Sequence, residues 1–146
     1  MADIINSFQG ENRFLSNFWN SPIQYDGLTY QNAEAAFQAA KCINPAEKTQ
    51  FTSMIKAGDA KYAGKRVKLR PDWENVKIGI MTDILRIKFA PGSDLADKLL
   101  KTGDAELIEG NTWKDDFWGV YNGRGRNELG KILMKIRAEL RNGRKN

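Results

Sequence analysis

The stretch IQYDGLTYQNAEAAFQAAK, residues 23–41, carries the strongest folding signals in the chain. Its first half predicts a β-hairpin between Ile23 and Tyr30. The reason is Asp26-Gly27, a dipeptide that readily adopts the positive φ angles of a two-residue hairpin turn between alternating apolar residues. Helix-forming residues follow directly, so the stretch indicates a mixed fold rather than an all-helical or all-β one.

The second half predicts a helix from Ala33 to about Cys42, because alanine, glutamate, glutamine and lysine favour helix. Asn32 stands where its side-chain oxygen can accept a first-turn N–H. Elsewhere, caps and apolar periodicity predict a second helix from Pro45 with Phe51, Met54 and Ile55 buried, a turn capped by Asp59, and helices after Asp72, around Leu95–Leu100 and after Asn127.

The rest of the chain adds one further strand candidate, Glu106 to Glu109, and no internal repeat or low-complexity linker. A chain of 146 residues fits one ordinary domain. We therefore expect a single compact α+β domain over residues 1–146, mostly helical with a small β-hairpin or sheet. Its basic end, residues 142–146, is expected to be a frayed tail.

Composition excludes several kinds of chemistry. The chain has no histidine and one cysteine, Cys42, so it has no Ser-His-Asp triad, no internal disulfide and none of the usual zinc ligand sets. If the protein is an enzyme, its carboxylates, lysines and aromatic side chains must therefore carry the chemistry. The net charge of +5 favours anionic partners such as phosphates, nucleotides or nucleic acid. Neither a secretory signal nor an apolar span is evident, which predicts a cytoplasmic protein without a membrane partner.

One group of candidate site residues shares a helix face. Glu34, Gln38 and Lys41 are spaced i, i+4 and i+7, so a helix projects them to nearly the same side. A lysine beside a carboxylate can attack a carbonyl or aldehydic carbon if burial lowers its pKa. The alternative is an exposed ion pair of modest stability, which is common on surface helices.

A second group lies in TWKDDFWGVYNGRGRNELG, residues 112–130. Glycines beside a helix start let backbone N–H groups approach an anion, and an arginine offers a two-pronged contact to phosphate. The alternative is a tight surface loop anchored by a tryptophan. The residues concerned are Asp115, Asp116, Trp118, Gly119, Asn122, Gly123, Arg124, Gly125 and Asn127.

Aromatic and basic residues give weaker signals. A set of aromatics could stack a nucleobase, although we expect most of them to pack in the core. The set is Phe14, Phe18, Trp19, Trp73, Trp113, Phe117, Trp118 and Tyr121. The segment Lys61 to Arg70 could steer phosphates, or form a solvated basic face.

Taken in order, these segments resemble the NADAR family, also called YbiA-like, which includes RibX-type riboflavin-biosynthesis N-glycosidases. The resemblance spans nearly the whole chain, and the WG followed by GxGxNxLGxxLM is its most specific part. The matching segments are FLSNF (14–18), the hairpin ending at Tyr30, AEAAFQAAK (33–41), RPDW (70–73), the series Met81, Lys88 and Phe89, LIEGNTWKDDFWG (107–119) and NGRGRNELGKILMKIR (122–137).

The resemblance implies hydrolysis of an N-glycosidic bond without a metal or another cofactor. The substrate would be ADP-ribose attached to guanine, in nucleotides or nucleic acid, or a phosphoribosylamino-pyrimidine of riboflavin synthesis. Glu34 and Lys41 match the family's helical glutamate and lysine, and Asp115 with Trp118 its D-x-x-W-G element. The family often has histidine after the glutamate, where this chain has Ala35.

Roles follow from the chemistry. Breaking a ribosyl C–N bond builds positive charge on the sugar, which carboxylates stabilise. We hypothesise that Glu34 and Asp115, or its neighbour Asp116, flank the anomeric carbon. Lys41 either forms an imine with the ring-opened sugar or acts as a cation. Trp118 would stack on base or ribose, and polar and phosphate groups would be held by Asn17, Asn122, Gly123, Arg124 and Gly125. The further substrate-binding candidates are Phe18, Gly119 and Asn127.

Two other functions remain open at this point. A catalytically idle module could bind ADP-ribose or a related nucleotide through Trp118 and the glycine loop, without depending on Glu34 or Lys41. A basic nucleic-acid-binding domain would use the Lys61 to Arg70 segment, and its affinity would fall steeply with salt. The sequence leaves the oligomeric state undetermined.

Overall fold

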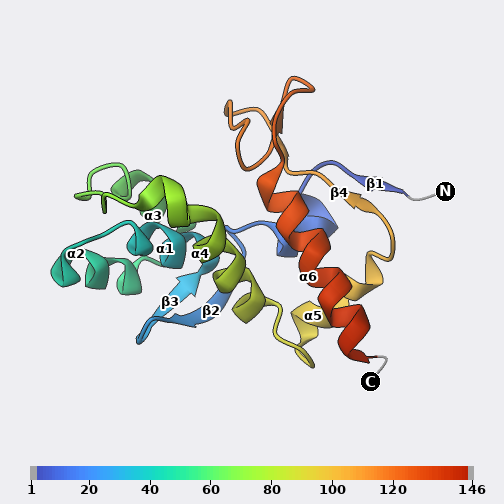
Figure 1. Cartoon of the computed structure of the whole chain (residues 1–146), viewed down its shortest axis with the longest axis horizontal. Coiled ribbons are helices and arrows are strands. Elements are labelled where there is room, and N and C mark those ends of the chain that lie inside the picture. Colours follow the sequence, from blue (N-terminus) through green and yellow to red (C-terminus); the bar gives the residue numbers. More distant parts are fainter. Residues whose placement is uncertain (1–2, 145–146) are drawn as a thin grey trace. The chain divides into compact units, whose positions relative to one another are not determined.

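The structure, a computed structural model, describes residues 3–144 and forms two compact units (Figure 1). One unit is Asn17–Lys88, and the other combines residues 3–16 with residues 89–144. Both contain helices and short strands, which confirms the predicted α+β fold class. The single-domain organisation stays a prediction.

The predicted hairpin opens the Asn17–Lys88 unit. Strand β2 (Asn20–Tyr25) pairs antiparallel with β3 (Leu28–Asn32), and Tyr25 faces Leu28 across the turn. The turn residues have positive φ angles, 51° at Asp26 and 84° at Gly27, as a two-residue hairpin requires.

Helix α1 (Ala33–Ala40) follows the hairpin without a linker and is buried along its whole length. Asn32 caps it as expected, because Asn32 Oδ1 accepts the N–H of Ala35 at 2.8 Å. The small side chains of its alanines allow neighbouring elements to approach closely on all sides. The hairpin, α3 and α4 all pack against α1.

Three helices and a 3₁₀ turn complete this unit: α2 (Pro45–Gln50), η2 (Phe51–Ser53), α3 (Ala57–Ala63) and α4 (Trp73–Lys88). Two expectations were wrong here. The α-helix ends at Gln50 and continues as a 3₁₀ turn from Phe51 to Ser53. Phe51 is buried, but Ile55 lies beyond this turn and is 65% exposed. Asp59 lies inside α3 rather than capping it, since Lys56 occupies the N-cap position.

In its described residues, the other unit contains η1 (Gly10–Leu15), two helices and four strands of two residues each. Strand β1 (Ile4–Ile5) pairs parallel with β4 (Glu106–Leu107), and β5 (Gly110–Asn111) pairs parallel with β6 (Val120–Tyr121). The predicted strand Glu106 to Glu109 is therefore shorter than expected. Helix α5 (Asp94–Lys101) begins at Ser93, whose Oγ accepts the N–H of Ala96.

Helix α6 (Glu128–Arg144) supplies the core of this unit. Its apolar positions are buried as the periodicity predicts: Leu129, Ile132, Leu133, Ile136 and Leu140. Buried Arg137 joins it to the α5–β4 turn by donating to Thr102 Oγ1 and to the Ala105 carbonyl, each at 2.8 Å. The helix continues to Arg144, so the expected frayed tail is wrong for residues 142–144, and residues 145–146 lie outside the described residues.

The Asn32 cap provides a test of this fold. Asn32→Ala removes the acceptor for the Ala35 N–H in a fully buried position, and should lower the free energy of unfolding by about 1–2 kcal/mol. Asn44→Ala, which removes the exposed cap of α2, is the matched control and should cost less. Urea unfolding measures both, and equal losses would contradict the central place of the buried cap.

Candidate active site

The predicted carboxylate Glu34 lies in the first turn of α1 and is only 7% exposed. Gln38, one turn later and 6% exposed, donates from Nε2 to Glu34 Oε1 at 2.8 Å. The pair is therefore buried, which contradicts the alternative of an ordinary surface ion pair. A buried carboxylate of this kind is costly to fold and is typical of functional sites.

Lys41 caps the C-terminal end of α1 and is half-buried. Its Nζ lies 5.9 Å from the centre of the Trp73 ring, a cation–π contact. Burial lowers the pKa of Lys41. The negative charge of Glu34 opposes this effect, and the positive charges of Lys65 and Lys77 lower the pKa further. A lowered pKa leaves more neutral amine near neutral pH, the form that can attack carbon.

Asn17 touches the same helix. Its carbonyl accepts the backbone N–H of Glu34 at 3.1 Å, and its Nδ2 lies 3.5 Å from the sulfur of Met81. Within the described residues, two buried side-chain oxygens have no hydrogen-bond partner, Asn17 Oδ1 and Gln38 Oε1. An unsatisfied buried acceptor lowers the stability of the fold by about 1–3 kcal/mol. Gln38 lies one turn after Glu34, and Asn17 bonds to the backbone of Glu34.

The aromatic residues are less buried than we expected from the sequence. Of the eight singled out, only Phe14 and Trp73 are in the core, whereas Phe18 is 43% exposed and Trp113 is 49% exposed. The others are half-buried, Trp118 among them. Phe18 directly follows Asn17, so the Asn17–Lys88 unit presents an accessible aromatic ring next to a residue that contacts Glu34.

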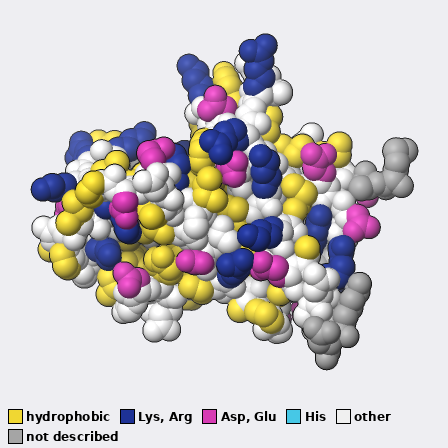
Figure 2. Space-filling model, in the orientation of Figure 1, with side chains coloured by type: hydrophobic (Ala, Val, Ile, Leu, Met, Phe, Trp, Pro, Cys, Tyr) yellow, Lys and Arg dark blue, Asp and Glu magenta, His cyan; other side chains and the backbone are white. Residues whose placement is uncertain are grey.

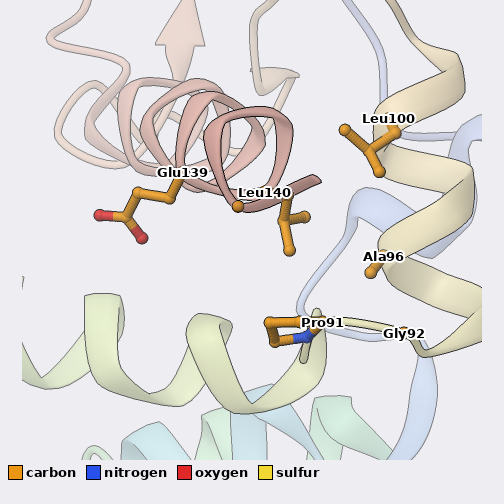
Figure 3. A pocket seen from close by; sticks show the side chains of 7 residues that line it. Pro91, Gly92, Ala96, Leu100, Glu139 and Leu140 are labelled. Carbon is orange, nitrogen blue, oxygen red and sulfur yellow. The ribbon is translucent and has the colours of Figure 1, made fainter. Parts of the chain in front are cut away.

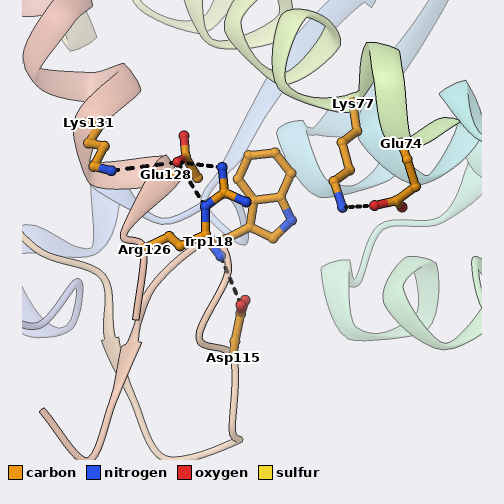
Figure 4. A network of polar contacts seen from close by, with 7 residues as sticks. All are labelled: Glu74, Lys77, Asp115, Trp118, Arg126, Glu128 and Lys131. Atoms are coloured by element: carbon orange, nitrogen blue, oxygen red, sulfur yellow. Dashed lines mark hydrogen bonds and ion pairs between the residues drawn. The ribbon is translucent and has the colours of Figure 1, made fainter. Parts of the chain in front are cut away.

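Asp115 holds the loop in front of Trp118 (Figure 4). Its Oδ1 accepts the backbone N–H groups of Phe117 at 3.1 Å and Trp118 at 2.9 Å, and Asn111 bonds both its N–H and its carbonyl. These contacts fix the backbone on which the Trp118 ring stands. Asp116 is exposed, so the choice between the two carboxylates as the catalytic one stays open.

The predicted glycine cradle is a tight turn. Tyr121 and Arg124 exchange backbone hydrogen bonds of 2.8 Å and 3.0 Å across Asn122-Gly123, whose φ angles are 53° and 75°. Both residues at the tip are exposed. The N–H groups of Tyr121 and Arg124 therefore hold the turn itself rather than facing a ligand.

The start of α6 uses its donors in the same way. The N–H groups of Asn127, Glu128 and Leu129 donate to the carbonyls of Gly119, Phe117 and Trp118 at 3.2, 3.1 and 2.9 Å. An anion at this helix start would have to compete with these bonds. Gly119, which supplies one of these carbonyls, approaches Glu109 so closely that a Cβ atom at position 119 would overlap it.

Asn127 corrects an expectation. It stands just before α6, yet its side chain does not cap the helix: Oδ1 accepts the Glu109 N–H at 3.0 Å and Nδ2 donates to the Leu107 carbonyl at 2.9 Å. Asn127 therefore joins the helix start to the segment after β4. Its left-handed backbone, with φ of 54°, turns the side chain away from the helix donors.

Ion pairs occur in both units. Beside the loop before α6, Glu128 pairs with Arg126 at 3.1 Å and with Lys131 at 3.6 Å (Figure 4). The Arg126 guanidinium stacks on the Phe117 ring at 4.6 Å. In the Asn17–Lys88 unit, Lys77 pairs with Glu74 at 2.7 Å. Arg126 is thus engaged by its neighbours, while Arg124 is exposed at the turn.

Basic side chains are spread over the face drawn in Figure 2, with acidic ones between them. In the segment Lys61 to Arg70, Lys65, Arg66 and Lys68 are exposed, whereas Arg70 forms a two-armed contact with Asp72 at 2.6 and 2.9 Å. The segment has the exposure that a phosphate-steering surface needs and also that of a solvated face.

Lys88 is a candidate that the residue patterns did not single out as a site residue. It ends α4, is 3% exposed, and burial lowers its pKa to about 7. Lysine is seldom fully buried, so its position is unusual. Only tertiary packing could reveal it, because a lysine at a helix C-terminus is ordinarily a solvated partner of the helix dipole.

A pocket of about 200 Å³ lies elsewhere, between the α5 region and α6 (Figure 3). Its walls are mainly apolar or small, including Pro91, Ala96, Leu100 and Leu140, and no predicted site residue lines it. The described residues contain no cluster of three or more histidine, cysteine or acidic side chains that could hold a metal ion. No helix among them is long and apolar enough to cross a membrane.

The predicted site residues divide between the units. Asn17, Glu34 and Lys41 gather around α1 with Gln38, and Phe18 lies beside them in the chain. The residues of the other unit gather in the loop before α6: Asp115, Trp118, Gly119, Asn122, Gly123, Arg124, Gly125 and Asn127. That Glu34 and Asp115 flank one sugar carbon stays a prediction.

Comparison with known proteins identifies the family. A model of the NADAR domain matches residues 6–141. The chain belongs to the NADAR family. The N-glycosidase YbiA of Escherichia coli K12 is 37% identical over 129 residues, covering 86% of this chain and 80% of the relative. An N-glycosidase of Nostoc punctiforme is 35% identical over 134 residues, covering 88% and 85%.

Other NADAR relatives differ in length. A riboflavin biosynthesis protein of Vibrio vulnificus is 38% identical over 135 residues, which cover 87% of this chain but 35% of the relative. The chain thus spans about a third of that protein. The solution structure of E. coli YbiA matches with a TM-score of 0.87 at 34% identity, covering 100% of this chain and 90% of that one. The names of these relatives support a glycosidase as the kind of enzyme.

Lys88 supplies a prediction about pH. The folded pKa is about 7 and the ordinary value is 10.5, so between them the unfolded state binds the extra proton. The cost of burying Lys88 is full below the folded pKa and disappears as pH approaches the unfolded value. The wild-type free energy of unfolding should therefore gain on that of Lys88→Met by up to about 1.4 kcal/mol per pH unit.

Urea unfolding of the two proteins between about pH 7 and about pH 10 measures this difference. Lys135→Met, at an exposed position of α6, is the control and should run parallel to the wild type. Parallel curves for Lys88→Met as well would show that the folded Lys88 keeps its ordinary pKa.

Proposed function

We propose that this protein hydrolyses the N-glycosidic bond between a ribose and a nitrogen of a base. The observation that carries the proposal is the buried Glu34 carboxylate, held by Gln38 on α1, with the lowered-pKa amine of Lys41 on the same helix. Family membership supports it, because relatives at 35–37% identity are named N-glycosidases.

Glu34 has the properties that the sugar side of the reaction needs. Positive charge develops on the ribose ring as the C–N bond breaks, and a carboxylate in a poorly hydrated position interacts with that charge more strongly than one in water. Glu34 stabilises the charge or activates the attacking water. Its Oε1 is already oriented by Gln38, so little reorganisation is required during the reaction.

Lys41 has two possible chemical roles. In the first, its neutral Nζ attacks the anomeric carbon of the ring-opened sugar, the base leaves with a proton, and water later hydrolyses the imine to release the sugar and restore the amine. In the second, the protonated amine holds a phosphate or carboxylate of the substrate. The lowered pKa favours the first role.

We propose a substrate with an anionic sugar, either ADP-ribose on guanine or a phosphoribosylamino-pyrimidine. The net charge of +5 suits both. Trp118, on the backbone that Asp115 fixes, stacks on the base or ribose, and exposed Arg124 contacts phosphate. ADP-ribosylated nucleic acid would additionally use the exposed lysines of the segment Lys61 to Arg70.

A turnover assay by mass spectrometry tests the reaction. Purified protein is offered ADP-ribosyl guanosine, ADP-ribosylated DNA and a phosphoribosylamino-pyrimidine, and we expect free base from at least one. Glu34→Gln should lower the rate by roughly 100-fold or more, because a neutral amide does not stabilise the developing charge. Glu106→Gln, at an exposed position of β4, should leave the rate unchanged.

The outcomes separate the functions. If wild type and Glu106→Gln release base from a substrate and Glu34→Gln does not, the N-glycosidase activity is established and its substrate is identified. Release that survives the substitution would remove Glu34 from the mechanism. If no substrate is cleaved but ADP-ribose binds equally to wild type and variant, the protein is a nucleotide-binding module.

A trapping experiment distinguishes the roles of Lys41. Borohydride added during turnover reduces an imine to a stable secondary amine, so the imine role predicts a protein adduct with the mass of the reduced sugar. Lys41→Arg should abolish it, while Lys135→Arg, at an exposed position, should not. Normal turnover without an adduct would leave Lys41 as a cation.

A further inference from the structure

We infer that Gln38 is a positioning residue for the Glu34 carboxylate and that Gly64 fixes the orientation of Gln38. The inference rests on the proposed function for the reaction involved. It gives the reaction two residues outside the acid, base and ring-stacking groups already described, and one of them stands directly after a different helix, α3.

The orientation of the Gln38 amide follows from its contacts. Nε2 donates to Glu34 Oε1 at 2.8 Å, and a carboxylate can only accept, so the amide nitrogen must face Glu34. Oε1 consequently points the other way. Within the described residues it meets no donor, although the side chain is only 6% exposed.

Gly64 explains why Oε1 occupies this position. Gly64 follows α3, which packs against α1, and a Cβ atom built on it would overlap Oε1 and Cδ of Gln38. The backbone of Gly64 has φ of −62°, which any residue adopts, so its conformation does not require glycine. The requirement is space: the missing side chain leaves room for the Gln38 amide.

Folding alone does not account for this arrangement. An apolar side chain at position 38 would fill the interior without leaving a buried acceptor unpaired. Glutamine adds an N–H donor that faces Glu34. Glycine at position 64 leaves the space that the Oε1 atom of the same amide occupies. A side chain at position 64 would displace the amide and release the carboxylate from its fixed orientation.

The test is a double-mutant cycle on Gly64→Ala and Gln38→Ala, with Gly58→Ala as the matched control. Gly58 lies in α3, the helix that Gly64 follows, and a Cβ atom there would meet nothing within 4 Å. We expect Gly64→Ala to lower kcat on the order of 10- to 100-fold with a much smaller change in KM. In the Gln38→Ala background the same change should have a much smaller effect, because Oε1 and Cδ are gone and only the Cβ of residue 38, 3.1 Å from a Cβ at position 64, remains close.

A second measurement needs no substrate. The side-chain NH₂ signals of Gln38 are identified in ¹H–¹⁵N spectra by their loss in Gln38→Ala. They should move in Glu34→Gln and in Gly64→Ala, and stay in place in Gly58→Ala. Thermal unfolding monitors whether each variant keeps a cooperative fold.

The results test the positioning role and the proposed function separately. Equal losses of kcat from Gly64→Ala in both backgrounds, or Gln38 signals unmoved by Gly64→Ala, would overturn the positioning role. If the wild type cleaves no substrate, the proposed function fails, and the Gln38 signals still decide whether Gly64 holds the amide against Glu34.

Discussion

The burial of helix α1 is the constraint on which the Asn17–Lys88 unit depends. Every residue from Ala33 to Ala40 is buried, and the helix packs against the hairpin, α3 and α4. Because the start of the helix is buried, its first N–H groups need acceptors from the protein. The Asn32 side chain accepts the N–H of Ala35, and the Asn17 carbonyl accepts the N–H of Glu34. The chemistry of the helix is thereby tied to its folding.

Polar groups on such a helix are expensive, and this chain keeps several of them. Glu34 and Gln38 are buried against each other, and burial lowers the pKa of Lys41. In the described part of the chain, the buried side-chain oxygens of Asn17 and Gln38 lack a hydrogen-bond partner. Buried apolar residues would stabilise the fold more. The retention of ionisable groups here, in a family whose relatives are named N-glycosidases, agrees with a site selected for reaction rather than stability.

The loop before α6 follows a different principle. Asp115 fixes the backbone of Trp118, the turn at Asn122-Gly123 satisfies its own donors, and three N–H groups at the helix start bond to loop carbonyls. The glycines and positive φ angles that suggest an anion cradle therefore serve the loop's own geometry first. What the loop presents outward is the half-buried Trp118 ring and exposed Arg124, which suit a base and a phosphate.

The sequence by itself determined the features whose causes are local. Asp26-Gly27 requires a tight turn, Asn32 and Ser93 cap the residues just after them, and the apolar period of α6 defines its buried face. Only the tertiary structure decided what depends on distant neighbours. Asn127 bonds to Leu107 and Glu109 instead of to its own helix, and Gly64 leaves space for Gln38. Lys88 is buried by the packing of the folded chain. These features depend on residues that lie far away in the sequence.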